Sequence, residues 1–269
     1  MASFHLQFFF FPLLIFISPS KAQQSPKPKA LLPISKDSST LQYLTHLNLG
    51  TPLNSKTLVL DLGGRNLWMD CDSNYNSSTY RPARCGSAAC STSTPIFGCL
   101  LCFDAGCHNN TCLISIENTV TSTVGFFEGI AGLGRTHLGL PHQLSLKFGP
   151  KFALCLPSTS KSNGAVVFGN PTTYLFYPNY NKSKLVDMSK FFAFTKLYIN
   201  PVPTAHDVPK GERSAEYFIG VTSIMIMGKP IRLNETLLSI DKNGHGGTKI
   251  STVNPYLHCT REFHIQGGS

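Results

Sequence analysis

The chain has 269 residues and a formal net charge of +9; 42% of its residues are hydrophobic and only 14% are charged. This apolar content, together with 22 glycines and 18 prolines, excludes a disordered chain and a coiled coil and favours a β-rich globular protein. The basic residues are scattered rather than gathered in runs. We therefore expect a solvated basic surface that suits acidic cell-wall polysaccharide as a partner and does not suit nucleic acid.

The N-terminal segment predicts secretion. Residues 7–17 form a short apolar run, and Ser20-Lys21-Ala22 follows it as a small-x-small cleavage site. The run is too short to span a bilayer, and no other segment could do so. We expect residues 1–22 to be a signal peptide and the protein to be extracellular, in the apoplast or cell wall, without membrane association. The Pro- and Lys-rich residues 23–39 predict an extended lead-in.

The segments that follow have the periodicity of short strands. Residues 41–49 alternate in polarity, and residues 56–62 are nearly all apolar, which predicts a strand buried on both faces. A short helix is expected over 141–148. Further strands are expected at 152–156, 165–168, 216–227 (one long strand or two broken at Gly220), 231–233 and 237–240. Short strands with regular turn signals between them predict an all-β fold.

The nine cysteines indicate a disulfide framework, since six of them lie within residues 85–112 and the chain carries an export signal. The alternative is a zinc site made of Cys99, Cys102, Cys107, His108 and Cys112. We favour disulfides and expect neither a metal nor a cofactor. The equal spacing within the cluster predicts a nested ladder: Cys85–Cys112 around Cys90–Cys107, with Cys99–Cys102 at the tip. Four sequons predict glycosylation at Asn76, Asn109, Asn181 and Asn234.

One aspartate, Asp61, stands at the end of an apolar strand, directly before Leu62-Gly63-Gly64. Aspartic proteases need two such carboxylates that share a proton around one water, each in an Asp-Thr/Ser-Gly-Thr/Ser loop. Here Leu62 and Gly64 replace the orienting hydroxyls. Where the second aspartate belongs, within residues 246–256, stands Ser251, whose hydroxyl cannot replace a carboxylate as base. We therefore predict no active catalytic residue: Asp61 is a structural remnant of the first catalytic aspartate, and Ser251 occupies the second position.

The stretches "DLGGRNLWMDCD", "GIAGLGRTHLGLP", "KFALCL", "SAEYFIGV" and "GGTKISTVNPY" resemble a plant family of basic 7S globulins, extracellular dermal glycoproteins and endoglucanase or xylanase inhibitors. The resemblance implies a pepsin-like aspartic protease fold with two β-barrel lobes but no catalytic dyad. It also implies a disulfide-bonded apoplastic glycoprotein that binds microbial glycoside hydrolases (xyloglucanase or xylanase) in plant defence, and a bond between Cys71 and Cys155. The alternative functions are an active aspartic endopeptidase and a storage or peptide-binding globulin.

The resemblance is interrupted at two places. Between Thr119 and Phe126 the family carries several dozen more residues, including the hairpin that covers the cleft, and after Tyr256 the match stops. We therefore expect an incomplete bilobal architecture, from a truncated or mis-spliced gene product. Its parts would be an N-terminal lobe over 40–175 with a disulfide-rich insertion, and a partial C-terminal lobe over 176–269 whose residues from 257 form a tail foreign to the family, with Cys259 left unpaired.

Overall fold

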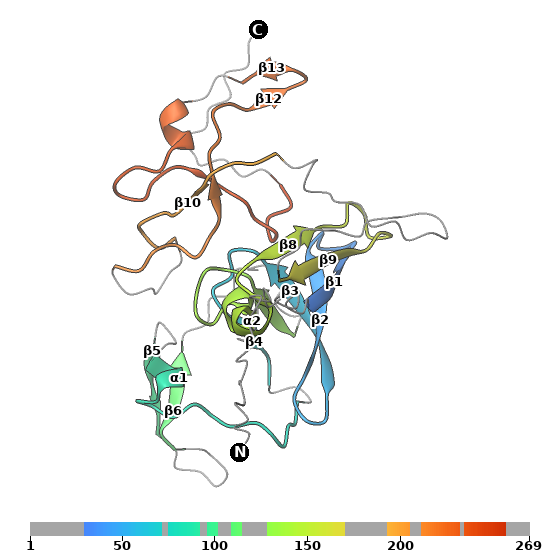
Figure 1. Cartoon of the computed structure of the whole chain (residues 1–269), viewed down its shortest axis with the longest axis vertical. Coiled ribbons are helices and arrows are strands. Elements are labelled where there is room, and N and C mark those ends of the chain that lie inside the picture. Colours follow the sequence, from blue (N-terminus) through green and yellow to red (C-terminus); the bar gives the residue numbers. More distant parts are fainter. Residues whose placement is uncertain are drawn as a thin grey trace, which may run out of the picture.

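A computed structural model describes residues 30–71, 75–91, 96–101, 109–114, 128–169, 193–204, 211–231 and 234–256. Figure 1 shows a larger N-terminal part built on one sheet, a smaller C-terminal part above it, and a small hairpin at its side. Most of the described regular structure is strand, which confirms the expected all-β class. Neither described α-helix has the length and hydropathy of a membrane-crossing segment. The expected signal peptide lies outside the described residues.

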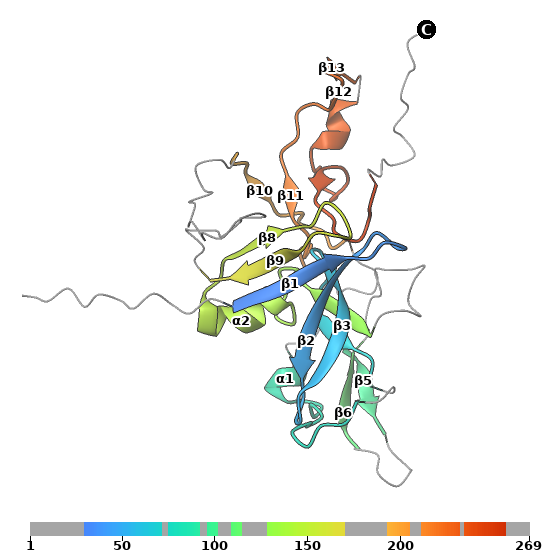
Figure 2. The same cartoon turned by 90° about the vertical axis from the view of Figure 1, so that its right-hand side faces the viewer.

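The N-terminal part is a seven-stranded sheet that curls around its core (Figure 2). Its order is β4-β7-β3-β2-β1-β9-β8, and every neighbouring pair is antiparallel except β3 and β7, which run parallel. The strands are β1 (Ala30–Lys36), β2 (Tyr43–Leu49), β3 (Asn54–Asp61), β4 (Leu67–Met69), β7 (Gly129–Gly132), β8 (Phe152–Cys155) and β9 (Gly164–Phe168).

The apolar patterns of the sequence correctly predict β2, β3, β8 and β9. As expected, β3 is buried on both faces at its end, from Leu58 to Asp61. The predicted helix is also present as α2 (Leu140–Phe148), which begins after Gly139 and packs Leu140 into the core with Leu133 and Phe168. Sequence and burial therefore agree on the part of the sheet that carries Asp61.

The prediction of residues 23–39 as a lead-in outside the lobe is wrong for its second half. Residues 30–36 form β1, which pairs with β2 on one side and with β9 on the other. Ile34 of this strand is buried in the main core. Pro33 misled the prediction, because a proline cannot donate a ladder hydrogen bond and is uncommon in a strand that is paired on both sides.

The C-terminal part has a three-stranded sheet in the order β10-β11-β14 and a separate β12–β13 hairpin. The strands are β10 (Leu197–Tyr198), β11 (Phe218–Ile219), β12 (Met225–Ile226), β13 (Lys229–Pro230) and β14 (Thr248–Lys249). The 216–227 segment is thus two short strands. The strand expected at 237–240 is wrong: residues Glu235–Leu238 form a 3-10 helix, because the Asn234 side chain caps it by accepting the Thr236 N–H. At 231–233, Ile231 is outside any strand, and residues 232–233 lie outside the description.

The cysteine cluster forms a small unit with β5 (Ile96–Leu100), β6 (Thr111–Ile114) and the short α1 (Ala88–Ser91). Its bonds are Cys85–Cys99 and Cys90–Cys112. The predicted Cys85–Cys112, Cys90–Cys107 and Cys99–Cys102 pairs are therefore wrong. The ladder assumed that residues 85–90 run beside 107–112. The structure bridges Arg84 to Thr111, but the chain then turns into α1, and β5 pairs with β6 and sets Cys112 opposite Cys99. These bonds also occupy two residues of the alternative zinc set.

The bond that the family resemblance implies between Cys71 and Cys155 is also not formed. Both residues are described, and Cys155 at the end of β8 keeps a free thiol. Burial raises the pKa of this thiol, so it stays protonated and unreactive near neutral pH. Cys259 lies outside the described residues.

An ion pair joins the start of β7 to β3. The Lys56 side chain is only 3% exposed, and its Nζ lies 2.9 Å from Oε1 of Glu128. The other oxygen of Glu128 accepts the backbone N–H of Thr57 at 2.7 Å. The hydrogen bond from Lys56, followed by the one from Thr57, lowers the pKa of the Glu128 carboxyl.

Because the pKa of Glu128 is lower in the folded than in the unfolded chain, the carboxylate stabilises the fold above the unfolded pKa of about 4.3. This stability is lost as the pH falls through the folded pKa. We expect Glu128→Gln to cost about 1–2 kcal/mol at neutral pH, a small value because Glu128 is 39% exposed. Urea titrations should find a flatter pH dependence below about pH 5 in the variant. A variant that loses stability in acid as steeply as the wild type would contradict this role.

Candidate functional site

Asp61 is the last residue of β3 and is buried, with only 3% of its surface exposed. Its carboxylate oxygen Oδ1 accepts the Gly63 N–H at 2.9 Å. Its backbone carbonyl accepts the N–H groups of Leu133 at 2.8 Å and of Gly64 at 3.2 Å. The loop after β3 is therefore held against the end of β7, and it fixes the position of this carboxylate.

Glycines let the two loops approach each other. A Cβ at Gly64 would lie 3.0 Å from both the Asp61 Cβ and the Gly132 Cα. A Cβ at Gly132 would lie 2.4 Å from the carbonyl oxygen of Asn66. Leu62, by contrast, points into the core. Neither position that carries a hydroxyl in an active protease loop offers one here, and Gly64 has little room for a side chain.

A threonine from the C-terminal part binds both sides of Asp61. The Thr252 hydroxyl accepts the Leu62 N–H at 2.8 Å and donates to the Leu60 carbonyl at 2.7 Å. Thr252 is 3% exposed, so these hydrogen bonds form away from water. Val253 next to it packs against Val59 and Ile130. These contacts join the two parts of the chain at the Asp61 loop.

Ser251 directly precedes Thr252. Its Oγ accepts the backbone N–H groups of Val253 at 3.3 Å and of Asn254 at 3.2 Å, so it stabilises its own turn. A serine hydroxyl carries no charge across the physiological range and cannot share a proton with a carboxylate in the way a second aspartate does.

A different carboxylate, that of Glu216, also reaches the loop. A Cβ at Gly63 would lie 3.0 Å from its Cγ. One carboxylate oxygen of Glu216 lies 2.5 Å from the Lys249 ammonium, and the other accepts a hydrogen bond from Thr204. Both carboxylate oxygens of Glu216 are therefore bound by side chains of the C-terminal part, Lys249 and Thr204.

The indole of Trp68 in β4 carries a buried N–H that has no hydrogen-bond partner among the described residues. A buried donor without a partner is uncommon in native structures. Residues 115–127, where the family is expected to carry its covering hairpin, lie outside the description. Trp68 itself packs against Val59 and Ile130 beside the Asp61 loop.

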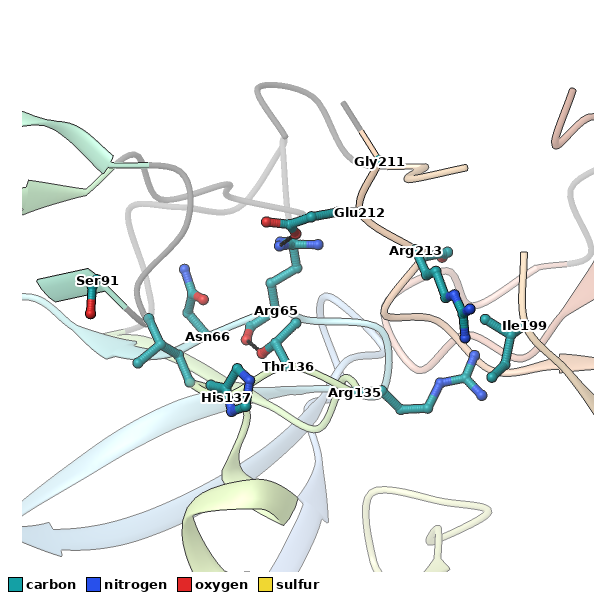
Figure 3. A pocket seen from close by; sticks show the side chains of 12 residues that line it. Arg65, Asn66, Ser91, Arg135, Thr136, His137, Ile199, Gly211, Glu212 and Arg213 are labelled. Atoms are coloured by element: carbon teal, nitrogen blue, oxygen red, sulfur yellow. Dashed lines mark hydrogen bonds and ion pairs between the residues drawn. The ribbon is translucent and has the colours of Figure 1, made fainter. Parts of the chain in front are cut away.

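A cavity of about 600 Å³ opens beside this loop, between the two parts of the chain (Figure 3). Arg65 lines it, with a side chain 9% exposed and Nη2 at 2.5 Å from Glu212. Arg135 and Arg213 approach each other at the other end. The remaining lining residues are Asn66, Ser91, Thr136, His137, Leu138, Ile199, Gly211 and Ser214.

Three of the four sequon asparagines are described and exposed, namely Asn76, Asn109 and Asn234. Exposure is necessary for a glycan acceptor, and glycosylation at these positions stays a prediction. Asn181 lies outside the described residues.

Two known family profiles match this chain, one in its N-terminal part and the other in its C-terminal part. The family profile described as "Xylanase inhibitor N-terminal" matches residues 43–128 and 125–170, in two pieces that meet where the sequence predicts a missing segment. The profile described as "Xylanase inhibitor C-terminal" matches residues 216–265, which include Ser251 and Thr252.

Three curated proteins illustrate the relationship. "Probable aspartic proteinase GIP2" of Nicotiana benthamiana is 44% identical over an alignment of 294 positions, gaps included, which covers 90% of this chain and 66% of that protein. "Gamma conglutin 1" of Prunus dulcis is 30% identical, with 95% and 67% covered. "Basic 7S globulin" of Glycine max is 28% identical, with 91% and 65% covered. The chain thus spans about two thirds, or slightly less, of the length of these relatives.

Two solved structures have the same architecture. The crystal structure titled "edgp" superposes with a TM-score of 0.73 at 40% identity, over 86% of this chain and 66% of that one. Conglutin gamma, a basic 7S globulin from lupine seeds, superposes with a TM-score of 0.62 at 26% identity over the same shares of the two chains.

Sequence reasoning placed Asp61 and Ser251 on loops that the structure does bring together, through Thr252. It missed Thr252 itself, although the Ser-Thr pair parallels the Asp-Thr pair of a protease loop and could have indicated it. It also missed the arginines of the cavity, which are far apart in sequence. No local pattern connects residues 65, 135 and 213.

Proposed function

Because the chain belongs to the xylanase-inhibitor family of pepsin-like proteins, which includes gamma conglutins and basic 7S globulins, we propose that it is a secreted, proteolytically inactive member. We propose that it binds and inhibits a microbial cell-wall-degrading glycoside hydrolase, a xyloglucanase or a xylanase. The observation that carries the inactive state is the Thr252 contact. We propose that Ser251, which directly precedes Thr252 and carries no carboxylate, occupies the position of the second aspartate of a protease.

The hydrolase as partner is supported by the names of the two matching family profiles. Secretion to the apoplast is supported by the leader-like residues 1–22 and by the disulfides Cys85–Cys99 and Cys90–Cys112, which persist in oxidising compartments. Because the chain spans only about 66% of the GIP2 relative, hydrolase binding is proposed for the chain as it stands and has to be measured on it.

The test is a titration of fungal xyloglucanase and of fungal xylanase with the purified chain, with residual hydrolysis as the measured quantity. We expect saturable inhibition of at least one enzyme and its capture by the immobilised chain. The comparison variant is Thr252→Val, which should lose the hydrogen bonds between the C-terminal part and the Asp61 loop. We expect it to inhibit less than the wild type. If neither hydrolase is inhibited or captured, the inhibitor role is wrong, and the storage or peptide-binding globulin becomes the better hypothesis.

A further inference from the structure

The cavity in Figure 3 carries more positive charge than its own contacts neutralise. Arg65 and Glu212 pair at 2.5 Å and offset each other. Among the described residues, no carboxylate pairs with Arg135 or Arg213. The guanidinium groups of these two arginines nevertheless point toward one another beside Ile199 (Figure 3). Two like charges that share one end of a cavity repel each other unless an anion lies between them.

Arg135 is held in this position by the protein. Its guanidinium carbon lies 5.0 Å from the centre of the Tyr217 ring, and its Nη2 donates to the carbonyls of Glu216 and Tyr198. The backbone of Arg135 also bonds the carbonyl of Ala215 at 3.0 Å. A guanidinium that is already ordered loses little freedom when it binds a ligand. Arg213 comes from the C-terminal part, so an anion held by both arginines would touch both parts of the chain.

The lining identifies the class of anion. A planar guanidinium binds a carboxylate through two parallel N–H donors. Beyond the arginines, the lining combines hydroxyl, amide and imidazole groups with apolar surface, to which Leu138 and Ile199 contribute. Such a mixed lining suits a sugar ring, whose hydroxyls can bind the polar groups while its C–H faces pack on the apolar surface. A volume of about 600 Å³ is enough for a short oligosaccharide.

We propose that this cavity is a binding site for a uronic acid residue of an acidic cell-wall polysaccharide, with Arg135 and Arg213 holding its carboxylate. The net charge of +9 favours approach of such a polyanion. The neutral lining groups Asn66, Ser91 and Thr136 lie toward the other end of the cavity, where the remainder of the sugar would lie. This proposal does not depend on hydrolase binding.

The test is calorimetric titration of the full chain with trigalacturonate at fixed ionic strength. Wild type should bind one trimer saturably. We expect Arg213→Gln to weaken binding at least tenfold, and Arg213→Lys, which keeps the charge but loses the planar fork, to weaken it less. The matched control is Lys229→Gln, which removes the same charge from exposed β13 and should change the affinity less than twofold.

Titrations with three other ligands distinguish a uronic acid site from binding by overall charge or to a peptide. The methyl-esterified trimer, which lacks the carboxylate, should not bind, and inorganic phosphate should compete only weakly. Equal losses in Arg213→Gln and Lys229→Gln would overturn the site, because binding would then follow overall charge alone. Binding of an acidic hexapeptide as tight as that of the trimer would overturn the polysaccharide as ligand. Undiminished binding of the esterified trimer would overturn the role of the arginines.

Discussion

Thr252→Val is expected to destabilise the chain by about 2–3 kcal/mol, although the two side chains have nearly the same shape. The hydroxyl of Thr252 is the hydrogen-bond partner of the Leu62 N–H at 2.8 Å, and it donates to the Leu60 carbonyl at 2.7 Å. A valine leaves the Leu62 donor buried without a partner and creates no cavity. The loss therefore reports the hydrogen bonds that join the C-terminal part to the Asp61 loop.

The free energy of unfolding should be measured by denaturant titration, with the fluorescence of Trp68 next to this loop as the signal. Thr252→Ser is the matched control, since it keeps the hydroxyl and removes only a methyl group, and we expect it to cost less than about 1.5 kcal/mol. If the valine and serine variants lose the same stability, packing and not hydrogen bonding joins the two parts.

Gly132→Ala should be more damaging still, with a cost of about 3 kcal/mol or more. A Cβ at this position would lie 2.4 Å from the Asn66 carbonyl oxygen and 2.5 Å from that of Gly64. Both oxygens belong to the backbone of the loop after Asp61, which cannot yield as a flexible side chain can. The Gly132 N–H also bonds the Asn66 carbonyl at 3.1 Å, so any shift breaks this contact.

Soluble yield and melting temperature of the purified variant measure this effect. Gly220→Ala is the matched control, because the three atoms nearest to a Cβ there all belong to the side chain of Tyr198, the first at 3.1 Å, and this side chain can move aside. We expect Gly132→Ala to be recovered in low yield or to melt many degrees lower than Gly220→Ala. Similar melting of the two variants would show that the loop around Asp61 is not tightly packed.

The sequence predicts those elements whose stability comes from local pattern. The apolar run that ends at Asp61 predicts a buried strand, and the proline-opened segment after Gly139 predicts a short helix; both are present. Prediction from the sequence fails where the partner of a strand or cysteine lies far away along the chain. β1 is a central strand because Ile34 fills the core, despite Pro33. The cysteine pairs follow the register of β5 against β6, which spacing along the chain does not determine.

The same distinction holds for the site. Asp61 is recognisable from its strand and glycines, because both are contiguous in sequence. The contact of Thr252 with Leu62 joins residues 190 positions apart, and it becomes visible only in the folded chain. Arg135 and Arg213 likewise line one cavity although they are far apart in sequence.

The most direct test of proteolytic inactivity is an assay of the purified chain against haemoglobin or a quenched fluorescent peptide. It is run between about pH 3 and pH 5, with and without pepstatin. We expect no pepstatin-sensitive cleavage by the wild type. We expect none by Ser251→Asp either, because Leu62 and Gly64 provide no hydroxyls to orient the carboxylates. If the wild type cleaves the substrate, and if both pepstatin and Asp61→Asn abolish this cleavage, the chain is an aspartic endopeptidase and the predicted inactivity is wrong.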